Sequence, residues 1–278
     1  MIDTASPRRS PFLELRRYEP RIAVAYTLLI LGGWLGLAWP LLWPGLVALL
    51  LWVIAVDGVM RPGSGLFIKT VKHGPRESDA VALSFDDGPD PEVTPALLDE
   101  LKRQGASATF FVVGTALAAQ AALGRRMIAE GHVVANHSWQ HSYMQSFRLH
   151  RWQTEELLRA ERGIEAATGW PSTRLYRAPV GIKTGDLARA ADDLGLRVVA
   201  WSVHSRDTLD PDPQAMARRV LKRIRAGDIV LLHDGGRVPG GRKQCVEAVR
   251  LILAGLREKG LRCVTLTELL GPTPGAPP

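Results

Sequence analysis

The sequence predicts an α/β fold: a distorted, incomplete (β/α)7-type barrel preceded by an N-terminal transmembrane segment. After residue 76, short apolar runs of strand type alternate with amphipathic helical stretches, a pattern typical of parallel α/β folds. Seven such units are too few for an eight-fold barrel of about 250 residues. The chain has no G-x-G-x-x-G motif, which argues against a doubly wound dinucleotide-binding sheet. Residues 22–56, before these units, contain no Asp, Glu, Lys, Arg or His.

The apolar run exceeds the roughly 20 residues that one untilted helical span needs. Pro40 and Pro44 interrupt it, and proline removes a helical N–H donor. We therefore expect two short helices, near 22–39 and 45–60, that form a membrane hairpin. A single long tilted span, kinked at the prolines, is the alternative. The run also holds four of the eight tryptophans, which favour membrane interfaces: Trp34, Trp39, Trp43 and Trp52.

Basic residues flank the apolar run on both sides. They are Arg8, Arg9, Arg16, Arg17 and Arg21 before it, and Arg61, Lys69, Lys72 and Arg76 after it. Because positive flanks prefer the cytoplasm, the hairpin predicts a bacterial inner-membrane protein whose α/β domain is cytoplasmic. A single span predicts a periplasmic or extracellular domain instead. In either case membrane lipids are expected partners.

The expected organisation has five parts. They are a basic tail (1–21), the transmembrane segment (22–60), a juxtamembrane linker (61–78), the α/β domain (79–270) and a flexible Pro- and Gly-rich tail (271–278).

The expected strands of the α/β domain are short and apolar. They cover 81–85, 108–113, 133–136, 175–177, 197–201, 229–233 and 262–266. Strands apolar on both faces, such as 229–232, are typical of parallel sheets covered by helices. The expected helices cover 93–104, 115–130, 152–168, 186–194, 213–226 and 243–259. A glycine follows each helix where a left-handed C-cap is wanted: Gly105, Gly131, Gly169, Gly195, Gly227 and Gly260.

Composition narrows the function classes. The chain has 278 residues, 46% hydrophobic and 23% charged, which is typical of a folding protein rather than a disordered one. Two cysteines exclude a four-cysteine zinc site and a disulfide-stapled scaffold. Lys+Arg of 35 against Asp+Glu of 28 gives a net charge of +7, partly placed beside the membrane run. No basic patch interleaved with aromatics is present, so no nucleic-acid partner is expected.

Polar residues collect where five of the seven strands end. The segments are S-F-D-D-G-P (84–89), H-S-W-Q-H (137–141), R-A-P-V-G (177–181), W-S-V-H-S-R-D (201–207) and L-L-H-D (231–234). In α/β barrels the carboxyl ends of the strands carry the chemistry, so we expect all five at one mouth.

The residue types suggest a catalytic metal. Of two adjacent carboxylates, Asp86 and Asp87, one can bind a metal while the other acts as a base, although helix capping also accounts for the pair. The i, i+4 spacing of His137 and His141 places both imidazoles on one side of a helical turn, as metal binding requires, although a solvated pair has the same spacing. With Asp87 the set offers two nitrogens and one oxygen, which leaves positions open for water and substrate. His233 is either functional or a core histidine satisfied by hydrogen bonds.

These five segments, in this order over about residues 79–270, resemble the NodB-homology polysaccharide deacetylase family, carbohydrate esterase family 4. The resemblance implies a metal-dependent hydrolase of N-acetylated sugars. Asp87, His137 and His141 would hold a divalent ion, usually Zn²⁺ and sometimes Co²⁺, which polarises the amide carbonyl and activates a water. Asp86 would be the general base.

The resemblance also assigns the remaining roles. Arg177 would orient Asp86, and the backbone N–H of Val180 would stabilise the oxyanion. His233, oriented by Asp207, would protonate the departing amine, and Leu231 would line the acyl pocket.

Three positions depart from the family pattern. Val180 stands where Tyr is frequent, His204 where Asp is frequent and Thr208 where Trp is frequent. We expect His204 to be a solvated loop histidine; a residue that contacts the substrate or supports the residues that do is the alternative. Thr208 would leave a more open or more polar acyl pocket. These departures leave the acyl group and the glycan undetermined.

The expected function is a membrane-anchored metal-dependent deacetylase. It would remove N-acetyl, or N-formyl, from amino sugars of a lipid-linked glycan, glycolipid or polysaccharide. Two alternatives remain: an O-acetyl carbohydrate esterase that uses the same residues, and an inactive member that binds a glycan or a synthase.

Overall fold

The computed structural model describes residues 19–142, 144–210, 212–236 and 243–274. It divides into two compact units, Met1–Ala55 and Val56–Pro278. The basic tail before residue 19 and the last four residues of the C-terminal tail lie outside the described residues, so both expectations remain predictions.

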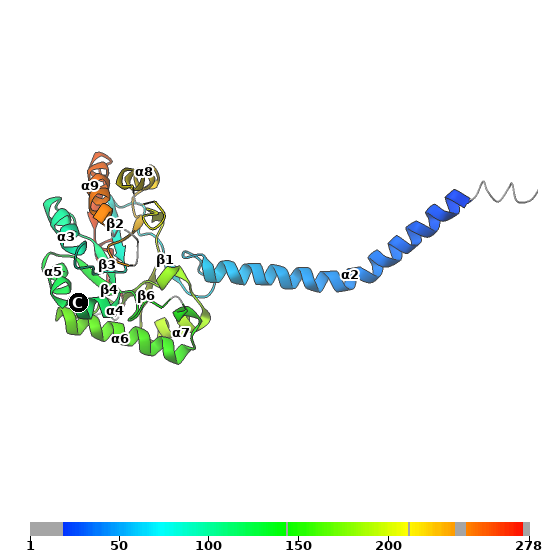
Figure 1. Cartoon of the computed structure of the whole chain (residues 1–278), viewed down its shortest axis with the longest axis horizontal. Helices are drawn as coiled ribbons and strands as arrows, with labels where there is room; N and C mark the ends of the chain where they lie inside the picture. The colour runs from blue at the N-terminus through cyan, green and yellow to red at the C-terminus, as the bar shows by residue number, and fades with distance from the viewer. Residues whose placement is uncertain (1–18, 143, 211, 237–242, 275–278) are drawn as a thin grey trace, which may run out of the picture. The chain divides into compact units, whose positions relative to one another are not determined.

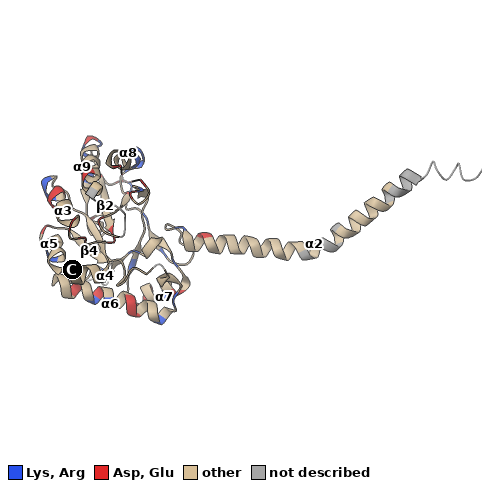
Figure 2. Cartoon of the chain, in the orientation of Figure 1, with Lys and Arg blue, Asp and Glu red and all other residues tan. Residues whose placement is uncertain are grey.

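The apolar run forms one helix, α2 (Glu19–Met60), that continues through Pro40 and Pro44. Figure 1 shows it as a single bent helix, and Figure 2 shows that it is nearly free of charged residues. The expected hairpin is therefore wrong, and the single kinked helix agrees with the structure. The physical reason is that proline removes one hydrogen bond and kinks a helix without requiring the chain to reverse. Within the described chain, Leu42–Met60 is the stretch long and apolar enough to cross a membrane, with a mean hydropathy of 2.0.

The second unit contains all seven expected strands. They are β2 (Ala80–Asp86), β3 (Thr109–Val112), β4 (Val133–Asn136), β5 (Leu175–Tyr176), β6 (Arg197–Val199), β8 (Ile229–His233) and β9 (Arg262–Val264). Two short strands were not expected: β1 (Thr70–Val71), which pairs with β6, and β7 (Val203–His204), which pairs with β8. All these pairings are parallel, as the apolar character of both strand faces predicts.

The order of the strands shows that the sheet curls round on itself. The order is β1-β6-β5-β4-β3-β2-β8-β7, with β9 beside β2. β6 and β7 follow each other in the chain but lie near opposite ends of this order, with only residues 200–202 between them. The Ala200 N–H donates to Val71 O (2.7 Å) on one side, and the Ser202 N–H donates to Ile229 O (3.0 Å) on the other. The predicted incomplete barrel is confirmed.

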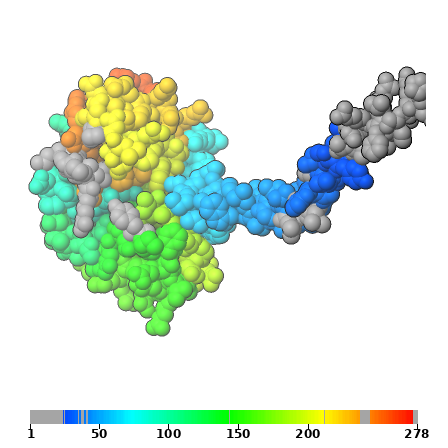
Figure 3. All heavy atoms as spheres, turned by 45° about the vertical axis from the view of Figure 1, so that its right-hand side comes forward, coloured from blue at the N-terminus to red at the C-terminus, as the bar shows by residue number. Residues whose placement is uncertain are grey.

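Helices cover the outside of the sheet (Figure 1). They are α3 (Thr94–Arg103), α4 (Gly114–Ala119), α5 (Ala121–Ala129), α6 (His150–Thr168), α7 (Gly185–Asp193), α8 (Pro213–Arg223), α9 (Lys243–Glu258) and α10 (Leu266–Leu270). In the space-filling view, the α8 region (yellow) and α6 (green) lie on opposite sides of the visible face (Figure 3). The expected helix 115–130 is divided at Gln120, which has non-helical φ and ψ of −128° and 40°. All six glycines predicted as C-caps have positive φ, between 61° and 81°.

The segment expected as a linker, 61–78, folds with the α/β domain. It contributes β1 to the sheet, and the Gly74 N–H donates to Gly227 O (2.7 Å). The compact unit accordingly begins at Val56, inside the last turns of α2.

Trp139 is wedged between two helices of the domain. A Cβ added at Gly114, in α4, would lie 2.3 Å from its ring, and one added at Gly163, in α6, would lie 2.5 Å from it. Arg159, also in α6, stacks on the same ring at 4.4 Å. Because Trp139 lies between His137 and His141, this wedge fixes the loop that carries both histidines.

We expect Gly163→Ala to destabilise the domain by about 1–3 kcal/mol, because the new methyl group would overlap a ring that is held from both sides. The sign is opposite to the gain of about 1 kcal/mol that alanine gives in an open helix. Gly185→Ala is the matched control, because a Cβ there, in the first turn of α7, meets nothing within 4 Å. Chemical denaturation of both variants measures the difference; equal stabilities would contradict the wedge.

Candidate active site and metal centre

The carboxyl ends of the parallel strands bring the predicted residues together. Asp86 ends β2 and lies opposite His233, which ends β8. His137 directly follows β4, and Arg177 directly follows β5. Residues from four separate segments of the chain therefore reach one end of the barrel.

Asp87, His137 and His141 form a cluster in which each offers one ligand atom, all within 4.8 Å of one another. The Asp87 Oδ1 atom lies 3.4 Å from His137 Nε2 and 3.1 Å from His141 Nε2. The His137 Nδ1–H donates to the carbonyl oxygen of Arg177 (2.8 Å), so in the neutral ring Nε2 carries a lone pair. Asp87 Oδ1 is buried and has the Nε2 atoms of both histidines as neighbours. Electron pairs facing a common point, with one imidazole oriented by a backbone carbonyl, fit a divalent cation.

The electrostatics of the cluster also favour a positively charged ligand. Burial by itself would raise the pKa of Asp87, but hydrogen bonds and charges from His137 and His141 outweigh it and hold that pKa well below its usual range. Burial likewise opposes protonation of His141, yet Asp87 outweighs it and raises the pKa of that imidazole. The carboxylate is therefore anionic and stabilises positive charge beside it.

The two histidines do not lie on a helical turn, so that expectation is wrong. Residues 137–141 form an irregular loop in which Ser138 (φ 69°) and His141 (φ 51°) are left-handed. The turn is held by side chains, because the Ser138 N–H donates to Asn136 Oδ1 (2.7 Å) and the His141 N–H donates to Ser138 Oγ (3.0 Å). The ring centroids of His137 and His141 are 5.0 Å apart, so both rings still face one point.

Asp86 is held by a buried arginine. Arg177 is 1% exposed, and its Nη1 donates to Asp86 Oδ1 (2.7 Å). The same guanidinium donates to Val199 O (3.3 Å) and Ala200 O (3.1 Å). Asp86 Oδ2 lies 3.7 Å from His137 Nε2, at the edge of the metal-ligand cluster. One carboxylate oxygen is thus fixed and the other faces the point where a reacting water would lie.

His233 and Asp207 form a second pair on the other side of Asp86. His233 Nδ1 lies 3.0 Å from Asp207 Oδ1, and the His233 backbone N–H donates to Asp207 Oδ2 (2.8 Å). Burial opposes protonation, but the Asp207 carboxylate outweighs it and raises the pKa of His233. With Nδ1 directed to Asp207, the Nε2 atom remains to carry a proton to a substrate.

The three other predicted positions lie around these pairs. Val180 belongs to a short 3-10 turn (Pro179–Gly181), has φ 56° and is 53% exposed. Leu231 is buried in β8 and faces the same side as His233, since alternate strand residues share a face. Thr208 is exposed, and the more open or more polar acyl pocket expected there stays a prediction.

His204 is not a solvated loop residue, so that expectation is wrong. It ends β7, with its ring centroid 5.9 Å from that of Trp201 and 6.5 Å from that of His233. Its Nδ1 accepts the backbone N–H of Arg206 (2.8 Å), which places the hydrogen of the neutral ring on Nε2. Burial lowers the pKa of His204, so the ring is a neutral donor beside the acid.

Sequence reasoning placed Asp234 in the cluster after the sixth expected strand but gave it no role. It is fully buried, its Oδ2 accepts Thr94 Oγ1–H (2.7 Å), and burial raises its pKa to about 7. A Cβ at Gly88 would lie 2.3 Å from this carboxyl, and one at Gly235 would lie 2.3 Å from the backbone oxygen of Asp87. The segment after β8 therefore packs against the backbone that carries Asp87. The signal in the sequence was H-D-G-G, an acidic residue followed by two side-chain-free positions.

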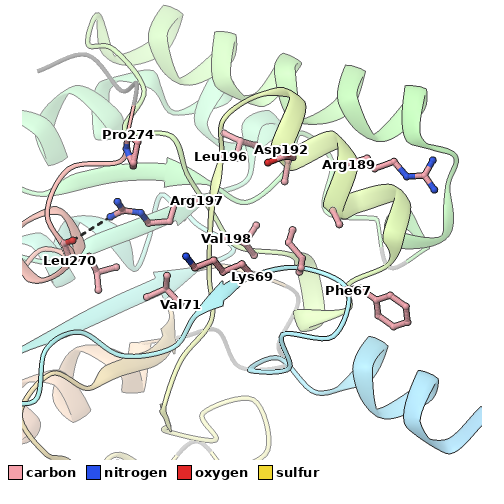
Figure 4. A pocket seen from close by; sticks show the side chains of 13 residues that line it. Phe67, Lys69, Val71, Arg189, Asp192, Leu196, Arg197, Val198, Leu270 and Pro274 are labelled. Carbon is pink, nitrogen blue, oxygen red and sulfur yellow. Dashed lines mark hydrogen bonds between the residues drawn. The ribbon is translucent and has the colours of Figure 1, made fainter. Parts of the chain in front are cut away.

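A hollow of about 650 Å³ lies elsewhere, between α7, β6 and the segment before β1. Figure 4 shows Phe67, Lys69, Asp192 and Arg197 around it, with Arg197 bonded to Leu270 O. None of the predicted site residues lines this hollow, so it is separate from the cluster at the strand ends.

Comparison with known proteins gives concordant results. A family model described as polysaccharide deacetylase matches residues 73–199. The chain is 40% identical over 202 residues to a chitooligosaccharide deacetylase of Bradyrhizobium sp. (strain ANU 289), covering 68% of this chain and 90% of that protein. It is 35% identical over 198 residues to a peptidoglycan-N-acetylglucosamine deacetylase of Bacillus cereus, covering 70% and 90%. A crystal structure of a peptidoglycan N-acetylglucosamine deacetylase bound to a substituted N-oxidanyl-benzamide superposes with a TM-score of 0.67 at 30% identity, covering 72% of this chain and 92% of the other.

We expect Asp87→Ala and His137→Ala to weaken binding of Zn²⁺ or Co²⁺ by more than about 100-fold, because even residues that only orient metal ligands are worth 10–100-fold. Isothermal titration calorimetry on the metal-stripped full chain in detergent measures this.

Asp86→Asn is the matched control, because it keeps the shape of the neighbouring side chain without altering the three ligand atoms. It should bind metal as the wild type does. An unchanged affinity in Asp87→Ala would contradict the ligand set.

Proposed function

Because the chain belongs to the polysaccharide deacetylase family, carbohydrate esterase family 4, we propose that it is a membrane-anchored, metal-dependent deacetylase of glycans that contain N-acetylglucosamine. The observation that carries this proposal is the placing of three groups side by side: the Asp87–His137–His141 cluster, the Asp86–Arg177 pair and the His233–Asp207 pair. A ligand set, a base and an acid are what amide hydrolysis requires.

A divalent ion held by Asp87, His137 and His141 would supply Lewis-acid chemistry, polarising the amide carbonyl and making water a better nucleophile. Zinc is the expected ion, and the same ligand types accept cobalt. The described structure supports the ligand set through its donor atoms and their distances.

Asp86 acts as the general base in this proposal. Its Oδ1 is bound to Arg177 Nη1 (2.7 Å), which fixes the orientation of the carboxylate. Oδ2 accepts a proton from the attacking water as the oxygen approaches the carbonyl carbon. Without Arg177 the carboxylate would be an isolated buried charge.

His233 acts as the general acid. An amide nitrogen leaves poorly as an anion, so it must receive a proton before the C–N bond breaks. The Asp207 carboxylate raises the pKa of His233 and orients its ring, which favours the form in which Nε2 carries this proton. Acetate and a free amino sugar are the products.

The proposed substrate class follows from the relatives and from the open mouth. Proteins similar to this chain are named for chitooligosaccharide and for peptidoglycan N-acetylglucosamine. Val180 and Thr208, which follow Arg177 and Asp207 in the chain, are exposed, and this supports access for a substrate longer than one sugar. A polymeric or oligomeric glycan is therefore favoured, and lipid-linked and glycolipid amino sugars share the same chemistry. Removal of N-formyl requires only a smaller acyl group.

We place the catalytic domain on the outer side of the bacterial cytoplasmic membrane. The single helix α2 supports this placement, because one span must leave one flank outside. The flank before the span carries five arginines within residues 1–21, and such a flank prefers the cytoplasm. The substrate would then be cell-wall or exported glycan.

The direct test of the reaction uses the full chain in detergent with zinc and a short N-acetylchitooligosaccharide. We expect mass spectrometry to show loss of one acetyl group (C2H2O) per turnover. Asp86→Asn, which retains the metal, should lower kcat by a factor of about 10²–10⁴. Full turnover by Asp86→Asn purified free of wild type would eliminate the base assignment, and release of O-acetyl groups alone would identify an esterase.

The pH profile tests the acid. Activity should fall as pH rises through the raised pKa of His233, because the proton-carrying form is lost. Asp207→Asn removes the carboxylate that raises the pKa of His233, so the alkaline limb should move to lower pH by about 1–2 units. The acidic limb serves as the internal control. An alkaline limb that stays in place would show that His233 is not the acid.

Reporter fusions at residue 274 test the placement. Alkaline phosphatase, active only outside the cytoplasm, should be active when fused there. A fluorescent protein that folds only in the cytoplasm should stay dark. The reverse pattern would place the domain inside.

A further inference from the structure

Val180 occupies a conformation that it does not favour. It is β-branched, and its φ of 56° lies in the left-handed region that favours glycine. Such strain persists only where the surrounding structure over-determines the backbone, and it concentrates at functional sites. Val180 is also the residue whose N–H, by the family resemblance, would stabilise the oxyanion of the proposed reaction, so the contacts that hold this turn affect the reaction.

Lys183, three residues further on, is the side chain that anchors the turn. It is 2% exposed, and its ammonium donates to Arg61 O (3.0 Å), Ser64 O (3.1 Å) and also Pro62 O. Its backbone N–H donates to Val59 O (3.1 Å). A buried ammonium that binds three backbone carbonyls fixes the path of both chain segments.

The same two segments are in contact beside the turn itself. A Cβ added at Gly181 would lie 2.7 Å from the ring of Pro62 and 3.1 Å from the ring of Trp201. On the other side, Ser146 Oγ–H donates to Ile182 O (2.9 Å). Residues 59–64 therefore form one wall against which the turn 179–181 is built.

We propose that Lys183 is a positioning residue, which ties the turn 179–181 to residues 59–64 and thereby holds Val180 in the left-handed conformation that aims its N–H at the oxyanion. The inference rests on the proposed function, because it assigns a purpose to that N–H. Without the ammonium, Arg61, Pro62 and Ser64 lose a shared donor and the turn loses its anchor. Val180 can then return to negative φ, which rotates its N–H away.

The test is a double-mutant cycle of Lys183→Met and Val180→Gly in the full chain with zinc. Lys183→Met keeps a long apolar side chain and removes the three donors. We expect its kcat to fall about tenfold, since small misplacements at a reacting centre have effects of this order. KM and bound zinc should stay unchanged, because the N–H acts on the transition state and the hydrogen bonds of Lys183 go to residues 59–64, not to the ligands.

The coupling between the two substitutions shows whether Lys183 acts through the conformation of Val180. Glycine adopts positive φ without strain, so in the Val180→Gly background the loss from Lys183→Met should shrink to less than about threefold. Lys69→Met is the matched control, because Lys69 is exposed and lies in the neighbouring segment; it should leave kcat unchanged. Equal losses in both backgrounds, or wild-type kcat in Lys183→Met, would overturn the inference.

If Lys183→Met fails to fold, Pro62→Ala provides the second route. It removes the ring that supports Gly181 and leaves Lys183 in place, so kcat should fall less, and Val180→Gly should again reduce the loss. Additive losses in that cycle also refute the inference. A wild-type chain that leaves N-acetyl groups in place refutes the proposed function instead, so the two failures are distinguishable.

Discussion

Arg177 enters the barrel with its charge buried, and the arrangement of the strand ends depends on how that charge is satisfied. Its guanidinium binds Asp86 and the carbonyls of Val199 and Ala200, and it lies 4.0 Å from the Phe111 ring centroid. Its own carbonyl accepts the Nδ1–H of His137. Arg177 therefore orients the proposed base and one proposed metal ligand, and it also binds the carboxyl end of β6. A buried charge that loses its partner is costly, so these contacts stabilise one another.

Backbone strain is concentrated around the same point. Asp87, Ser138, His141 and Val180 all have positive φ without being glycine. Each lies just after a strand, where the chain must leave the sheet and still direct a group inward. The scaffold compensates locally: side-chain acceptors hold the histidine loop, and the Asp234 segment packs against Asp87. The regular strands hold the backbone in place, and the left-handed residues turn the chain so that its groups face the site.

Much of this was predictable because it follows from local patterns. Apolar runs predicted the seven strands, and the glycines after the helices predicted left-handed caps. The clusters after the strands predicted which side chains would meet. The rest depends on long-range contacts. Nothing near His204 in the sequence shows that its ring lies 6.5 Å from that of His233 on the neighbouring strand, and the i, i+4 spacing of the histidines suits a helix as well as the loop that forms. The prolines in α2 are compatible with a turn or a kink, and only the whole structure decides between them.

The contact between Lys183 and residues 61–64 has a consequence for separating the domain from α2. A soluble fragment that starts at the first long strand, near residue 79, would leave an ammonium inside the protein without acceptors. Such a group is driven to lose its proton or to draw water into the interior. Proteolytic shedding between the helix and β1 would therefore also alter the catalytic end of the barrel. A fragment meant to retain full activity has to begin before Val59, with part of the helix still attached.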